Sequence, residues 1–132
     1  MDPLVDVLRH ERELLESLLF RLVEAAFVAT ADAGRWRARA ASDLDEAVTL
    51  VRRTELLRAL TAGDAALEVG LDPDAPLRSL AETVGQPGRS VLLDHRDALE
   101  TLSLEIVAAT HRLPTAERFA GCELRSLAEF LR

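Results

Sequence analysis

The sequence lacks several residue types altogether. Lysine, asparagine and tyrosine are absent, so all 16 basic residues are arginines. A single cysteine, Cys122, excludes an intrachain disulfide and is typical of a protein from a reducing compartment. Four phenylalanines, one tryptophan and one isoleucine leave few of the residues that strands prefer. This composition disfavours a β-sheet.

Long apolar runs and excess positive charge are also missing. No run approaches the roughly 18 apolar residues of a membrane-spanning helix, so we expect no stable membrane insertion. The first residues carry acid where a signal peptide needs base, which predicts a cytoplasmic protein. The net charge of −7 disfavours nucleic acid as a partner.

The residues that are present have a composition typical of one soluble helical domain. The 132 residues are 48% hydrophobic and 30% charged, which is enough apolar content for one core. The six glycines and five prolines lie almost wholly between segments of helical periodicity. They divide the chain into expected helices over residues 3–31, 36–69, 76–84, 89–112 and 122–132. Asp2 is the expected N-cap of the first helix and Gly70 the expected C-terminal cap of the second.

Apolar residues repeat every three and four positions along the three long helices, as in helices that pack lengthwise. The predicted inward seam of the first helix consists of Leu4, Leu8, Leu15, Leu18, Leu22, Ala25 and Ala29. That of the second consists of Trp36, Ala40, Leu44, Ala47, Val51 and either Leu57 or Arg58. That of the third consists of Leu92, His95, Leu99, Leu102, Ile106 and Ala109. Leu50 and Leu57 form a second stripe on the second helix, which indicates contacts on two sides.

The predicted fold is therefore all-α. We expect an elongated antiparallel bundle of three long helices, with a short inserted helix and a C-terminal amphipathic helix. Residues 1–112 form the helical bundle body of this single domain. Residues 113–132 form a hinge, which contains Pro114 and Gly121, and the C-terminal amphipathic segment.

Residues that could carry chemistry are few. The Glu-x-x-His pairs of di-iron bundles are absent at all three histidines, so we expect no metal, no cofactor and no catalytic residue. His10 is expected at the surface, and His95 on the core seam with a neighbouring polar partner. Cys122 is expected as a small, half-buried apolar residue. Trp36 is expected to anchor the start of its helix, within a cluster of surface arginines.

The C-terminal segment is the most informative part of the sequence. Leu124, Leu127, Ala128 and Leu131 share one helical face, with Phe130 beside it. Such a face either packs on the long helices or docks into another protein. Periodicity alone leaves both alternatives open.

Several stretches of the chain resemble the FlgN family of flagellar export chaperones, in its actinobacterial form. The resemblance extends from about Val5 to Leu131 and includes the order of the helices. It is carried by residues 11–24, Trp36, and residues 55–59, 70–71, 77–81 and 92–99.

The resemblance implies a cytoplasmic chaperone of type III export. Such a protein binds the C-terminal helical segments of hook–filament junction proteins, prevents their premature assembly and presents them to components of the export gate. Because the family binds its clients through the C-terminal region, the implied partner-binding residues are Phe119, Leu124, Leu127, Phe130 and Leu131. The alternative is a self-contained helical bundle, with a structural or regulatory role and no export client.

Overall fold

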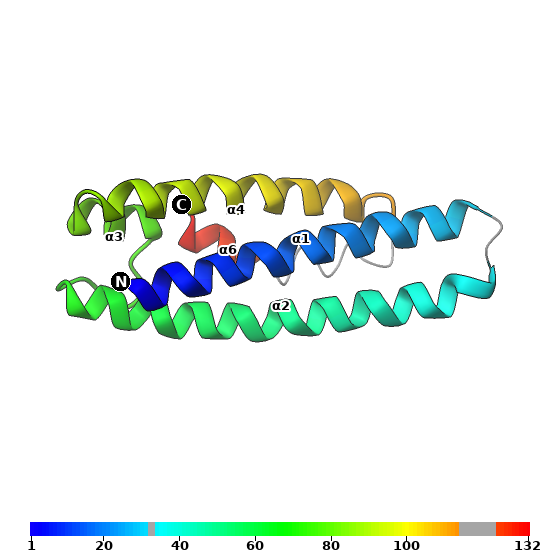
Figure 1. Ribbon diagram of the computed structural model, residues 1–132, viewed down its shortest axis with the longest axis horizontal. Helices are drawn as coiled ribbons and strands as arrows, with labels where there is room; N and C mark the ends of the chain where they lie inside the picture. The colour runs from blue at the N-terminus through cyan, green and yellow to red at the C-terminus, as the bar shows by residue number, and fades with distance from the viewer. Residues whose placement is uncertain (32–33, 114–123) are drawn as a thin grey trace.

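Three long helices run along the length of the molecule (Figure 1). The computed structural model describes residues 1–31, 34–113 and 124–132. The long helices are α1 (Asp2–Thr30), α2 (Gly34–Glu68) and α4 (Gly88–Thr110). The short ones are α3 (Leu77–Val84) and α6 (Arg125–Phe130). The described part of the chain contains no strand, and the all-α prediction is confirmed.

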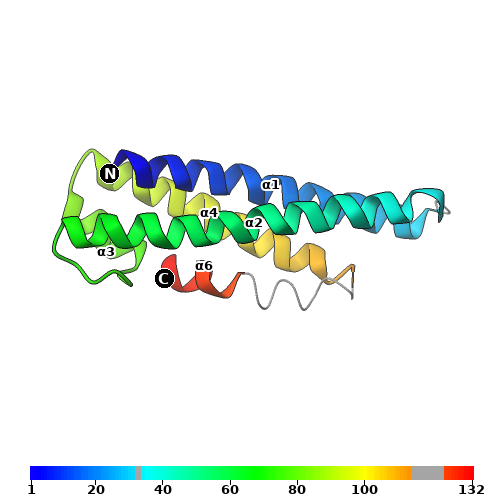
Figure 2. The same cartoon turned by 90° about the horizontal axis from the view of Figure 1, so that it is seen from below.

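Helix α1 packs against both α2 and α4, and α3 packs against α4. Each long helix is antiparallel to the preceding one, so α4 runs in the same direction as α1 (Figure 1). Helix α6 runs back along the bundle, on the side of α2 and α4 that faces away from α1 (Figure 2). It therefore occupies part of the position of a fourth bundle helix.

The first helix begins one residue earlier than predicted. Its N-cap is Met1, which makes no side-chain capping hydrogen bond, so the expectation for Asp2 as N-cap is wrong. Asp2 lies inside the first turn, where its negative charge is favourable to the helix dipole. Pro3 also lies in that turn, where a missing N–H leaves no bond unmade.

The second helix ends just before Gly70, as the sequence predicted. Gly70 adopts a φ of +79°, in the region that favours glycine, and Leu71 N donates to Ala66 O at 2.8 Å. This six-to-one bond is the signature of a Schellman motif, which turns the chain out of the helix. The interior Gly63 does not interrupt α2, and a Cβ at this position would lie 3.6 Å from Pro73 Cβ. The loop after α2 therefore returns close to the last turns of α2.

The predicted seams are confirmed most fully in α4, where all six seam residues are buried. The seam of α1 is buried only as far as Leu22, whereas Ala25 is half-buried and Ala29 is exposed. In α2, Arg58 is buried and Leu57 is exposed, which resolves the alternative left by the sequence. Trp36 is about half exposed at 49%, because the end of the α1–α2 hairpin has little to pack against it. The core therefore becomes thinner towards the tip of the α1–α2 hairpin.

Candidate partner-binding site at the C-terminal helix

The residues predicted to bind a partner lie on α6 and beside it. Leu124, Leu127 and Leu131 are buried, with exposed fractions of 5%, 0% and 5%. Phe130 is partly buried against the same core. Phe119 lies outside the described residues, as do Cys122 and residues 114–121 of the predicted hinge. The structure therefore brings the three leucines together on the inner face of α6, where they contact the body.

Two arginines of the body hold α6 in place. Arg96 of α4 donates from Nε to the backbone oxygen of Leu131 at 2.8 Å. Arg58 of α2 places its guanidinium carbon 4.8 Å from the centroid of the Phe130 ring, in a cation–π contact. Because the two arginines come from different helices, α6 bridges α2 and α4. We call the surface that receives it, formed around Arg58 and Arg96, the α6 seat.

A buried ion pair lies directly under this seat. Arg58 and Glu11 of α1 are each only 1% exposed, and Arg58 Nε lies 3.2 Å from both carboxylate oxygens of Glu11. Arg58 Nη2 also approaches Glu55 Oε1 at 3.6 Å. One guanidinium thus joins α1, α2 and α6, through two carboxylates and one aromatic ring.

The environment of Glu11 perturbs its acidity. Burial raises the pKa of the Glu11 carboxyl from 4.5 to about 7, and the nearby Glu55 carboxylate adds to the rise. The Arg58 guanidinium acts in the opposite direction, through its charge and its hydrogen bond, but does not offset the burial. The charge of Glu11 therefore changes near neutral pH.

Sequence reasoning missed this pair, although a signal for it was present. Glu11 lies three residues after Leu8 and four before Leu15, which places it on the seam of α1. Arg58 lies seven residues after Val51 on the seam of α2. Two opposite charges at seam positions of antiparallel neighbours indicate a buried pair, provided that the register of the two helices is known.

A cavity of about 370 Å³ lies beside the α6 seat. Its lining includes Arg58, Pro73, Asp74, Ser126 and Phe130. The cavity lies between α2, the loop that follows it and α6. This side of the seat is therefore less tightly packed than the side occupied by the leucines.

His95 of α4 lies near the first turns of α1. It is 6% exposed, and its Nδ1 lies 3.1 Å from Arg12 Nη1 of α1. Burial and the positive charge of Arg12 lower the pKa of the His95 imidazole below its usual value. The prediction of a core histidine with a polar neighbour is confirmed, and His10 is exposed as expected.

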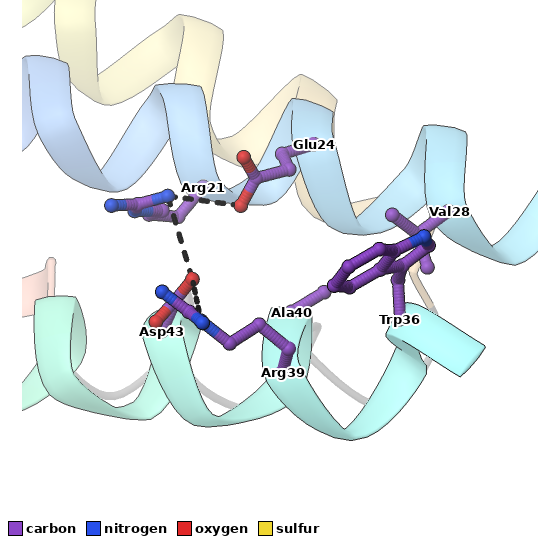
Figure 3. A pocket seen from close by; sticks show the side chains of 7 residues that line it. All are labelled: Arg21, Glu24, Val28, Trp36, Arg39, Ala40 and Asp43. Carbon is purple, nitrogen blue, oxygen red and sulfur yellow. Dashed lines mark hydrogen bonds and ion pairs between the residues drawn. The ribbon is translucent and has the colours of Figure 1, made fainter. Parts of the chain in front are cut away.

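A second cavity, of about 420 Å³, lies near the tip of the α1–α2 hairpin (Figure 3). Arg21 pairs with Glu24 at 3.0 Å and with Asp43 at 3.6 Å, and Arg39 pairs with Asp43 at 3.6 Å. Trp36 forms the apolar end of the cavity. Because its two arginines and two carboxylates pair with one another, the cavity carries no excess charge that would select an ionic ligand. These pairs link α1 to α2 where the apolar seam has ended.

Other classes of site find little support in the described part of the chain. Residues 1–31, 34–113 and 124–132 contain no group of three histidine, cysteine or acidic side chains placed to hold a metal ion. None of the described helices is both long and apolar enough to cross a membrane. Comparison with known protein families, curated protein sequences and solved structures finds no match to this chain.

Proposed function

We propose that this protein is a flagellar type III export chaperone of the FlgN type. It would bind a C-terminal helical segment of a hook–filament junction protein in the cytoplasm, keep it from assembling early and carry it to the export gate. The observation that carries the proposal is a short amphipathic helix, α6. Its buried leucines, the Arg96–Leu131 hydrogen bond and the Arg58–Phe130 contact hold it on the α6 seat.

The length of α6 supports exchange with a partner. Its six residues are too few to form a stable helix in water, so its structure depends on contact with the body. An amphipathic client helix with apolar residues at the same spacing offers a longer contact of the same chemistry. Release of α6 would expose both its leucines and the α6 seat, and both would then contact the client.

Such a mechanism favours moderate affinity. Opening α6 costs the burial of Leu124, Leu127 and Leu131, and this cost is subtracted from the free energy of client binding. A chaperone that must release its client at the export gate is suited to this reduction. The same cost keeps these leucines buried against the body when no client is present.

The burial of the same three leucines also supports a second candidate function. A bundle whose C-terminal helix belongs to its own core needs no client, and the bond from Arg96 to Leu131 is a contact of that kind. On this alternative the protein is a self-contained structural or regulatory bundle.

Binding of a client peptide separates the two functions. We expect the chain to form a 1:1 complex with the C-terminal helical segment of a junction protein, measured by gel filtration and isothermal titration calorimetry. The variant Arg96→Ala removes the bond to Leu131 and should bind the peptide several-fold more tightly, because α6 opens more readily. Asp97→Asn is the matched control, because it removes an ion pair of Arg96 without touching α6.

Each outcome favours one of the two functions. Tighter binding by Arg96→Ala, with Asp97→Asn like the wild type, is the result expected for a chaperone with an opening α6. No binding by the wild type or by either variant would reject the chaperone and favour the self-contained bundle.

A further inference from the structure

Helix α2 carries a row of leucines that the body does not cover. Leu50, Leu57, Leu60 and Leu67 are 40%, 52%, 62% and 60% exposed, and Leu56 beside them is 66% exposed. We call these five residues the α2 leucine stripe. Exposed leucines that occur singly are normal, but five within five turns of one helix form a largely apolar surface.

The stripe has the spacing of a helix–helix seam. Steps of seven, three and seven residues separate the four leucines, which places Leu50 and Leu57 at a positions of a heptad and Leu60 and Leu67 at d positions. The two remaining seam positions between Leu50 and Leu67 are the exposed Arg53 and Asp64. Most buried residues of α2 lie on its other side, and the stripe runs along the edge of the contact with α1. At this edge Leu50 lines a cavity with Leu14 of α1, and Asp64 lines another with Leu4. The α2 leucine stripe includes Leu50 and Leu57, the second stripe that the sequence indicated.

We propose that the α2 leucine stripe binds the same stripe of a second copy of this chain, in antiparallel orientation. A two-fold axis between Arg58 and Ala59 places Leu50 opposite the partner's Leu67, and Leu57 opposite the partner's Leu60. The same axis places Arg53 opposite the partner's Asp64. Every position of the seam then meets a complementary one, as an isologous interface requires.

The charges of Arg53 and Asp64 determine the relative orientation of the two α2 helices. A parallel pairing in register would place Arg53 against Arg53 and Asp64 against Asp64, so that like charges would meet inside an apolar seam. The antiparallel pairing forms two Arg–Asp pairs instead. Within one chain, Arg53 and Asp64 are about 16 Å apart along the helix axis, too far to pair with each other. Neither side chain forms an ion pair with another residue of the described chain.

The net charge of the chain does not oppose this contact. Between positions 50 and 67, α2 carries the three arginines Arg52, Arg53 and Arg58 and the two acids Glu55 and Asp64. The acidic excess that gives the chain its net charge of −7 therefore lies outside the interface. The contact involves one helix of about five turns from each copy, which is small for a permanent dimer. We expect a dimer whose population rises with protein concentration.

Sedimentation velocity of the full chain, from low micromolar to near-millimolar concentration, tests the proposal. The wild type should pass from monomer to dimer over this range. Arg53→Asp alone and Asp64→Arg alone should each raise the dimer dissociation constant about tenfold or more, because like charges then meet. The double variant Arg53→Asp/Asp64→Arg should restore the wild-type constant. Circular dichroism establishes that each variant keeps its helices.

Leucine variants separate the stripe from apolar surface in general. Leu60→Glu should abolish the dimer, whereas Leu104→Glu, at a residue of α4 that is 67% exposed, should leave it unchanged. A chain that stays monomeric at the highest concentration would overturn the proposal. So would single charge variants that dimerise like the wild type, or a Leu104→Glu variant that loses the dimer.

Cysteine crosslinking tests the orientation. In a Cys122→Ser background, Leu50→Cys and Leu67→Cys chains are oxidised separately and as a mixture. The antiparallel pairing predicts a disulfide dimer only in the mixture, because each of these positions faces the other across the axis. Efficient dimers of Leu50→Cys alone would show a parallel contact and contradict the proposal. The experiment involves no client, so its outcome is independent of the proposed chaperone function.

Discussion

Replacing Glu11 with glutamine tests whether burial controls the charge of the cluster beneath α6. The folded chain raises the pKa of the Glu11 carboxyl from 4.5 to about 7, chiefly because the carboxyl is buried. Folding is therefore coupled to the protonation of this group.

The sign of this coupling follows from the two pKa values. Between pH 4.5 and about 7 the folded state holds a proton on Glu11 that the unfolded state has lost. The protonated carboxyl thus favours the folded state fully below pH 4.5, and this contribution declines as the pH rises towards 7. Above about pH 7 the contribution is gone. A rise of this size corresponds to about 3 kcal/mol, which is a large part of the roughly 5–15 kcal/mol that stabilises a typical domain.

Urea unfolding followed by circular dichroism, at a series of pH values from acid to mildly alkaline, measures this effect. We expect the free energy of unfolding of the wild type to fall by about 3 kcal/mol relative to Glu11→Gln as the pH rises through this range. His95 titrates with the opposite sign, because its pKa is lowered, so it adds stability as the pH rises through its unfolded value. Since both proteins carry His95, its contribution cancels in the difference.

The matched control is Glu13→Gln, at an exposed carboxylate outside the seam. It should follow the pH profile of the wild type. A wild-type profile parallel to that of Glu11→Gln, or one that rises relative to it with pH, would show that burial does not raise the pKa of Glu11.

Three further predictions concern the core and the ends of helices. Leu99→Asp should unfold the bundle because an unpaired charge in the core costs several kcal/mol. Leu104→Asp should keep the wild-type melting temperature because Leu104 is 67% exposed. Thermal melting followed by circular dichroism distinguishes the two variants. Leu127→Ala together with Leu131→Ala should abolish client binding but shift the urea midpoint only slightly, because α6 opens locally before the body unfolds. A loss of about 2–5 kcal/mol for each leucine, as expected for core leucines, would show that α6 belongs to the core. Gly70→Ala should cost about 1–2 kcal/mol because its φ of +79° is unfavourable for alanine, and equal stability of this variant would contradict the capping role of the glycine.

The long helices were predictable because their information is local. Pro3 and Gly70 mark helix ends through backbone preferences that need no tertiary contact. The seam of α4 was predicted completely because all of its positions except His95 are apolar and regularly spaced. Near the tip of the α1–α2 hairpin the same reasoning failed for Trp36, because burial there depends on a neighbouring helix rather than on spacing.

The candidate site was only partly predictable. Spacing placed Leu124, Leu127 and Leu131 on one face, but not on which surface that face would lie. The answer depends on contacts such as the bond from Arg96 to Leu131, between residues separated by 35 positions in the chain. The Glu11–Arg58 pair escaped prediction because a charge on an apolar seam is recognised only when its partner on the facing helix is known.

The proposed chaperone function requires a client helix to bind where α6 now packs. Hydrogen exchange followed by mass spectrometry, on the free chain and on the chain saturated with the junction-protein peptide, tests it most directly. We predict faster amide exchange in α6 than in α4 of the free chain, since a six-residue helix opens locally, and slower exchange in α6 once the peptide is bound. Exchange in α6 that equals that of α4 in the free chain, or that stays unchanged when the peptide is added, would contradict this mode of client binding.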